Sequence, residues 1–91
     1  MNKADLVNAI SDKAGVTKKQ ADTVLSAALE IIIDSVSDGD KVTLVGFGSF
    51  EPRHRKERNG RNPQTGKALT IPATTVPAFS AGKLFKEQVA S

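Results

Sequence analysis

Several residue types that support enzyme chemistry are missing from the sequence. It has no cysteine, tryptophan or tyrosine, and His54 is its only histidine. Without cysteine the chain has no disulfides, no thiolate metal ligands and no thiol nucleophile. His54 lies in a stretch without apolar residues, so it cannot serve in a shielded set of nucleophile, base and orienting group. We therefore expect a protein that is not an enzyme and that holds no metal or other cofactor.

Long hydrophobic runs are also missing. The longest strongly apolar run is Ile31–Ile33, whereas a membrane helix needs about 20 consecutive apolar residues. The N-terminus has charged residues on both sides of its first apolar residues, unlike a secretory signal peptide. The 91 residues are enough for one domain with a small core, and a core of that size often needs a partner subunit. We expect a soluble, cytoplasmic protein of one domain.

The first 37 residues show two helical patterns. Apolar residues recur every three or four positions over residues 3–14 and again over 18–37, which predicts two helices. Asn2 and the pair Thr17 and Gln20 supply N-terminal caps. The second helix is apolar around more of its circumference than one small sheet or helix could cover, so we expect a second subunit. The predicted dimer core consists of Leu29, Ile32, Ile33, Phe47, Phe50 and Phe79.

The next segment has the pattern of a β-hairpin. Residues 41–45 alternate between polar and β-branched or apolar side chains, as a half-buried strand does. Gly46–Gly48 then predicts a turn, and Ser49 begins the returning strand. We expect these residues to start an antiparallel sheet.

The C-terminal third is expected to contain further β structure and a short helix. Apolar spacing returns over residues 67–77, where Pro72 and Pro77 limit regular ladder pairing. A last helix is predicted over residues 81–89 because apolar and basic residues fall on opposite sides of it. Ser80 is its predicted N-cap.

Between these elements lies a segment without any apolar residue, from Arg53 to Asn62. It is flanked by two strand halves and leads into an Asn-Pro-x-Thr-Gly turn, which favours a long β-hairpin that projects from the body. The alternative is a solvated loop, although long structureless loops are uncommon in compact domains and more often functional. We place this arm at about residues 52–75 of a single domain, 1–91.

Positive charge is concentrated in the same arm. Residues 1–50 carry five lysines against seven acidic residues, a balance of −2, whereas residues 51–91 carry eight cations against three carboxylates, a balance of +5. All four arginines lie between Arg53 and Arg61. Because arginine presents a planar fork of donors that suits phosphate, we expect an anionic partner.

Pro63 lies at the tip of the predicted hairpin, between Asn62 and Gln64. Proline is compact, rigid and unable to donate a hydrogen bond, as are the apolar wedges that minor-groove proteins push between base steps. A simple turn-forming role is the alternative, and the residues themselves leave both roles open.

Four motifs resemble the bacterial histone-like HU family, and the resemblance covers the whole chain. They are Gly46-Phe47-Gly48-Ser49-Phe50, Gly60-Arg61-Asn62-Pro63-Gln64-Thr65-Gly66-Lys67, Ile71-Pro72-Ala73, and Val76-Pro77-Ala78-Phe79 followed by Gly82-Lys83. The resemblance implies an α+β fold in which two N-terminal helices and a short C-terminal helix form the body of an intertwined homodimer. A three-stranded antiparallel sheet of each subunit then extends into a long β-ribbon arm.

The same resemblance implies that the two arms embrace duplex DNA in the minor groove and that Pro63 intercalates. It implies an architectural protein that bends, wraps and compacts DNA in the nucleoid with little sequence preference. HU is itself one of the proteins from which this groove chemistry is known. Nicked, gapped or kinked duplex is expected to bind best because unstacking costs less there.

Positions that match the family assign DNA contacts to the arm, to lysines on the body and to the turn beneath the DNA. These are Lys3, Gly46, Phe47, Arg53, Arg55, Arg58, Arg61, Asn62, Pro63, Lys67 and Lys83. We expect further DNA contacts from Lys56, Gln64, Thr65 and Lys86. Pro52, at the root of the outgoing strand, departs from the family's pattern.

Other functions stay open on the sequence. A site-preferring DNA bender like integration host factor would use the same arms with shape readout. An RNA-binding module would normally stack bases on surface aromatics, whereas the four phenylalanines all have plausible core positions. For a protein-interaction module the basic arm would be incidental.

Overall fold

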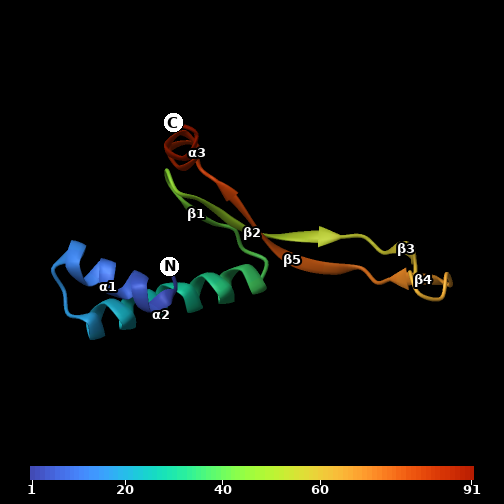
Figure 1. The fold of residues 1–91 in the computed structure, drawn as a ribbon, viewed down its shortest axis with the longest axis horizontal. Coiled ribbons are helices and arrows are strands. Elements are labelled where there is room, and N and C mark those ends of the chain that lie inside the picture. The colour runs from blue at the N-terminus through green and yellow to red at the C-terminus, as the bar shows by residue number, and fades with distance from the viewer. The chain divides into compact units, whose positions relative to one another are not determined.

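In the computed structural model, which describes residues 1–91, the chain forms three helices and five strands (Figure 1). In order, these elements are α1 Lys3–Ala14, α2 Lys18–Ser37, β1 Val42–Leu44, β2 Gly48–Arg55, β3 Arg58–Arg61, β4 Ala68–Ile71, β5 Thr74–Ala81 and α3 Lys83–Ala90. All strand pairs are antiparallel. None of the helices combines the length and the hydrophobicity that a membrane crossing requires. The chain divides into two compact units, Met1–Asp34 and Ser35–Ser91.

Local side-chain chemistry sets the ends of the helices in the first unit. The side chain of Asn2 accepts a hydrogen bond from the backbone N of Asp5 at 2.9 Å, and Asp5 accepts one from the backbone N of Asn2 at 3.1 Å. Gly15 ends α1 in the left-handed conformation, with φ 69°. Thr17 and Gln20 form a second reciprocal cap at 3.0 and 3.1 Å. The predicted bounds of both helices are confirmed.

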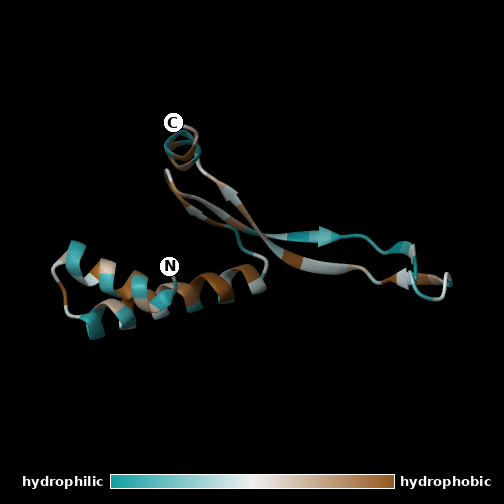
Figure 2. Cartoon of the chain, viewed as in Figure 1, coloured by the Kyte–Doolittle hydropathy of each residue, from teal (hydrophilic) through white to brown (hydrophobic).

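Very little apolar surface is covered within the chain. Val7 in α1 and Ala21 in α2 are its only buried hydrophobic residues. Further along α2, Leu29 is 43% exposed, and Ile31 and Ile33 are each 63% exposed. Figure 2 shows that much of α2 is hydrophobic. Leu29 and Ile33 are four residues apart and share one side of α2, whereas Ile31 lies on a different side. Neighbouring exposed apolar side chains such as Leu29 and Ile33 are typical of an interface with another protein chain.

The second unit is built on a three-stranded antiparallel sheet with the strand order β1-β2-β5. A tight turn joins β1 to β2, and the backbone N of Phe47 closes it by donating to the backbone O of Leu44 at 3.0 Å. β2 pairs with β5 over all eight residues of each strand. The predicted hairpin of β1 and β2 is confirmed.

The return from the arm differs from the sequence-based expectation. The β structure consists of two strands, β4 and β5, and β5 continues to Ala81 rather than ending near residue 77. Ser80 therefore lies inside β5, opposite Ser49. The N-cap of α3 is Gly82, which makes no side-chain cap. The prediction of Ser80 as the cap is wrong because cross-strand pairing holds this residue in extended backbone.

Backbone hydrogen bonds hold the start of α3 against the turn between β1 and β2. The backbone N of Gly82 donates to the backbone O of Phe47 at 2.8 Å, and that of Phe85 donates to the backbone O of Gly46 at 3.2 Å. A Cβ on Gly82 would lie 3.0 Å from the backbone of Gly46, so this close approach requires glycine. These contacts replace the missing side-chain cap.

The four phenylalanines form one cluster in this unit. The ring centroids of Phe50 and Phe79 are 4.8 Å apart, and that of Phe47 lies 5.4 Å from those of Phe79 and Phe85. Gly48 makes room for the cluster, because a Cβ at this position would lie 2.5 Å from the Phe79 ring. Phe47 and Phe79 nevertheless remain 47% and 42% exposed. The cluster therefore has an open side.

Beyond the sheet, β2 and β5 continue as a two-stranded ribbon that β3 and β4 extend (Figure 1). The residue pairs of β3 and β4 continue the register of β2 and β5. Lys56–Glu57 and Pro72–Ala73 form an unpaired step between the two ladders, where Pro72 has no N–H to donate. The predicted long hairpin is confirmed, with this one interruption.

Candidate nucleic-acid interface

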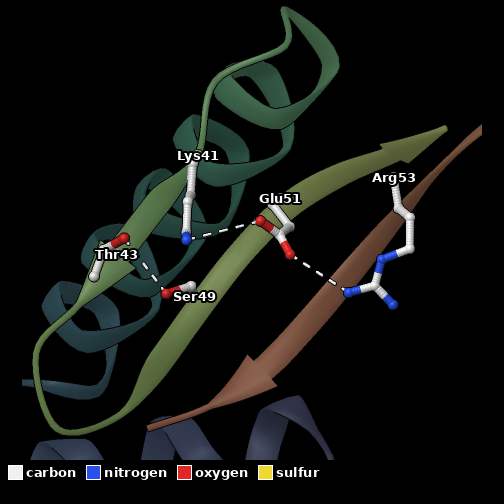
Figure 3. A network of polar contacts seen from close by, with 5 residues as sticks. All are labelled: Lys41, Thr43, Ser49, Glu51 and Arg53. Carbon is white, nitrogen blue, oxygen red and sulfur yellow. Dashed lines mark hydrogen bonds and ion pairs between the residues drawn. The ribbon is translucent and has the colours of Figure 1, made fainter.

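The three-stranded sheet separates apolar and polar side chains onto its two faces. Side chains alternate between faces along a strand, and Phe50 in β2 lies opposite Phe79 in β5 on one face. The intervening residues of β2, namely Ser49, Glu51 and Arg53, lie on the other face, which we call the polar face (Figure 3). The sheet thus presents phenylalanine rings on one side and charged and hydroxyl groups on the other.

Hydrogen bonds and ion pairs connect the side chains of the polar face (Figure 3). The Ser49 hydroxyl donates to Oγ1 of Thr43 at 3.4 Å. Oε2 of Glu51 lies 3.8 Å from Nζ of Lys41, and its Oε1 accepts a hydrogen bond from Nη2 of Arg53 at 3.4 Å. The side chains of Lys41 and Arg53 are 58% and 55% exposed, so both cations remain accessible to a ligand on this face.

Two prolines mark the root of the arm. Pro52 in β2 lies directly opposite Pro77 in β5 within an unbroken ladder. Because proline has no N–H, both residues are tolerated where their backbone nitrogens point away from the partner strand. β1 has ended before this level, so the missing donors lie on the outer edges of the ribbon, where proline also discourages pairing with a further strand. Pro52 therefore fits the arm without breaking it.

The four arginines of the arm do not form one stripe. Arg53 and Arg55 lie two residues apart in β2 and share a face, whereas His54 lies on the opposite face. Arg58 and Arg61 lie three residues apart in β3 and occupy opposite faces of the tip ladder. All four side chains are exposed. Cations therefore lie on both faces of the ribbon, an arrangement that suits a groove with phosphates along both walls.

The tip of the arm is a turn held by Asn62. Its side-chain Oδ1 accepts a hydrogen bond from the backbone N of Gln64 at 2.9 Å, and its backbone O accepts one from the backbone N of Gly66 at 2.8 Å. The backbone N of Asn62 in turn donates to the backbone O of Lys67 at 2.9 Å. Pro63 is exposed within this turn. The tip therefore presents a rigid apolar ring at the end of a basic ribbon.

The body lysines lie on helices and already have acidic neighbours. Nζ of Lys3 lies 3.7 Å from Oδ1 of Asp22 and donates a hydrogen bond to the Ser26 hydroxyl at 2.8 Å within the first unit. Nζ of Lys83 lies 3.9 Å from Oε1 of Glu87, one turn further along α3. These pairs are largely exposed and leave both lysines accessible.

The remaining predicted contact residues are spread over the second unit. Lys56 lies in the unpaired step of the arm, Thr65 accepts a hydrogen bond within the tip turn, and Lys86 is exposed on α3. Gly46 lies under the start of α3, and the ring of Phe47 belongs to the phenylalanine cluster. The structure therefore does not bring the Phe47 ring to the polar face.

Sequence reasoning missed the polar face as a unit. Lys41, Thr43, Ser49, Glu51 and Ser80 were not among the predicted contacts. Thr43 is nevertheless hydrogen-bonded to Ser49 and Lys41 is paired with Glu51 on one face, and Ser80 lies opposite Ser49. The alternation of residues 41–45 indicated which side chains of that strand share a face. Recognition of the whole polar face also required knowledge of which strands pair with each other. No group of acidic or histidine side chains is placed to hold a metal ion. The surface offers cations and hydroxyl groups, which are suited to a polyanion.

Sequence comparison agrees with this chemistry. The family model of bacterial DNA-binding proteins matches residues 1–90. The chain is 71% identical over 90 residues to DNA-binding protein HU of a Nostoc species, covering 99% of this chain and 96% of that relative. It is 54% identical over 89 residues to DNA-binding protein HU of Staphylococcus aureus, covering 98% of this chain and 99% of that relative.

Solved structures are similar over the same length. Anabaena HU in a cocrystal with DNA aligns with a TM-score of 0.94 and 71% identity, covering 99% of this chain and 98% of that chain. HU from Thermotoga maritima aligns with a TM-score of 0.69 and 34% identity, covering 98% of each chain. The helices, the sheet and the extended arm are thus features that this chain shares with those structures.

Proposed function

The chain belongs to the HU family of bacterial DNA-binding proteins, and from that membership we propose that it binds duplex DNA with little sequence preference and bends it. The arms would lie in the minor groove, with Pro63 inserted between base steps. In minor-groove proteins, HU among them, the extra protein surface that bent DNA contacts offsets the cost of unstacking. The role is architectural, not enzymatic, and its place is the nucleoid in the cytoplasm.

The observation that carries this proposal is the exposed Pro63 at the tip of a ribbon with cations on both faces. Arg53, Arg55, Arg58 and Arg61 can bind the sugar-phosphate backbone without reading bases, which gives affinity without sequence preference. The Asn62 turn holds Pro63 in place, so a wedge is already formed before DNA is bound. Lys3, Lys83 and Lys86 would add phosphate contacts from the body.

We further propose that the working unit is a homodimer. Leu29 and Ile33 of α2 and the open side of the cluster at Phe47 and Phe79 are exposed in the single chain. Ile32 and Phe50 are only half-buried. A second copy would cover both surfaces, and two copies would supply the two arms needed to hold a duplex from both sides.

A gel-shift titration with four labelled ligands of equal length tests the DNA-binding part of the proposal. The ligands are intact duplex, duplex with a single nick, single-stranded DNA and double-stranded RNA. We expect the nicked duplex to bind best, followed by intact duplex, because unstacking costs less at a nick. Preference for RNA or for single strands, or no binding to any ligand at low salt, would contradict it. Strong dependence on duplex sequence would indicate a site-preferring DNA bender instead.

A further inference from the structure

Glu51 is the only acidic residue in the three strands of the sheet. It lies on the polar face, between a lysine before β1 and the first arginine of the arm (Figure 3). A carboxylate on a surface that binds DNA is unfavourable, because phosphates repel it. Its position therefore requires a reason other than contact with DNA.

The geometry gives Glu51 two cationic partners at once. One carboxylate oxygen lies 3.8 Å from Nζ of Lys41, and the other accepts a hydrogen bond from Nη2 of Arg53 at 3.4 Å. The Glu51 side chain is 32% exposed, less than either partner. The carboxylate is therefore less accessible to a ligand than the two cations, whose side chains are each more than half exposed.

A carboxylate and a phosphate compete for the same donors on Lys41 and Arg53. Both are anions that accept charge-assisted hydrogen bonds, and arginine binds either one through the same N–H groups. In the free protein Glu51 accepts a hydrogen bond from Arg53 and forms an ion pair with Lys41, whereas DNA must displace the carboxylate or share the cations with it. Exposed ion pairs of this kind contribute little stability, so a phosphate can replace them.

We propose that Glu51 is an internal competitor for DNA phosphates that restrains Lys41 and Arg53 on the polar face and thereby moderates DNA affinity. This inference rests on the proposed function, since it assumes that the polar face and the root of the arm contact DNA. In the complex, a phosphate takes the place of the carboxylate on one or both cations. Glu51 thus positions the two cations and itself makes no favourable contact with the ligand.

The test is Glu51→Gln, which keeps the size of the side chain and removes its charge. Affinity for a short intact duplex is measured by fluorescence anisotropy at several salt concentrations. Removal of two exposed pairs corresponds to tighter binding by roughly 2- to 30-fold. The slope of log K against log salt should become steeper by about 0.9 for each additional phosphate that the freed cations neutralise. Unchanged or weaker binding would overturn the proposal, and weaker binding would show that Glu51 helps the cations to meet DNA.

Two further variants make the result specific. Asp12→Asn makes the same change in net charge on α1, where Asp12 forms no ion pair, and it should leave affinity and slope nearly unchanged. An equal increase in affinity from both variants would mean that overall charge, rather than the network, is responsible, and would overturn the proposal. Glu51→Ala, with its fold checked by circular dichroism, should give the same direction as Glu51→Gln. Arg61→Ala must still weaken binding, because failure of that control would contradict the proposed function itself.

Discussion

The helix α2 and the arm both expose many side chains, but those of α2 include large apolar residues and those of the arm are mainly polar and cationic. α2 exposes large apolar side chains, with Ile31 and Ile33 each 63% exposed. From Arg53 to Asn62 the arm contains no apolar side chain at all, and its four arginines are exposed. Removal of apolar surface from water lowers the free energy. Arginine is instead stabilised by charge-assisted hydrogen bonds to an anion. The exposed surface of α2 therefore favours a protein partner, and the exposed surface of the arm favours a polyanion.

The two surfaces should respond differently to salt concentration. Contacts between arginine and phosphate weaken steeply as salt rises, because binding releases counterions from DNA. Burial of apolar surface is not screened in this way, and some salts strengthen it. Association through α2 should therefore persist under salt conditions in which DNA dissociates.

The greatest change is expected from a substitution in α2. Ile33→Asp should abolish the homodimer, because it removes about 1.5–3 kcal/mol of burial per side chain and places a carboxylate without a partner in the interface, which costs several kcal/mol more. Folding of the unaltered chain should depend on protein concentration for the same reason. Sedimentation equilibrium combined with circular dichroism measures both.

Lys13→Ala, on the polar side of α1, is the control and should leave the dimer intact. Lys13 takes part in no ion pair, and its favourable interaction with the end of the helix is worth about 0.3–1 kcal/mol. A well-folded species of 9.6 kDa at micromolar concentration would show that the exposed surface of α2 needs no second copy.

Substitutions in the arm should have the next greatest consequence. Arg58→Ala and Arg61→Ala should each weaken binding to all duplex sequences alike and reduce the slope of log K against log salt by about 0.9 for every phosphate that is no longer neutralised. In a homodimer each substitution is present twice, so a change of up to about twice that value is expected. Anisotropy titrations over a salt series measure the slope, with Lys13→Ala as the matched control. Affinity that did not respond to salt would rule out phosphate contacts as its source.

Pro63 should affect the shape of the DNA more than its affinity. Pro63→Ala removes the ring but leaves the Asn62 contacts and every cation of the arm in place. We therefore expect a shallower bend, measured by fluorescence energy transfer across a short duplex, and a salt slope close to that of the unaltered protein. The preference for nicked duplex should also decrease, because the wedge is what exploits a step that is already unstacked. An unchanged bend and an unchanged preference would assign Pro63 to turn formation alone.

The features that the sequence predicted well are those that neighbouring residues determine. Both N-terminal helices have the predicted bounds because Asn2, Gly15 and Thr17 act through hydrogen bonds or backbone angles within a few residues. The tip turn was predictable for the same reason, since Asn62 bonds to residues two and four positions further on. Local chemistry of this kind can be recognised without knowledge of the rest of the fold.

The features that were missed depend on which strands lie side by side. Ser80 has the chemistry of an N-cap, but pairing with Ser49 on β2 overrides that preference. No role was predicted for Glu51 from the sequence, because only the pairing of β1 with β2 brings Lys41 close to it on the same face as Arg53. Lys41 and Glu51 are separated along the chain by a strand and a turn, so their spacing in the sequence gives no sign of the network.

A smaller difference should separate the true helix cap from the mistaken one. Thr17→Ala removes the side-chain acceptor for the backbone N of Gln20 at 3.1 Å, and removal of such a cap costs typically about 1 kcal/mol. Ser80→Ala removes no cap, because α3 begins after Gly82 and is held by backbone bonds, so its cost should stay within about 0.5 kcal/mol. Urea unfolding of both variants and of the unaltered protein at one fixed concentration gives the two differences. A cost for Ser80→Ala equal to that for Thr17→Ala would mean that the hydroxyl stabilises the end of β5 and the start of α3 after all, and that the sequence pattern had identified a real determinant of the helix.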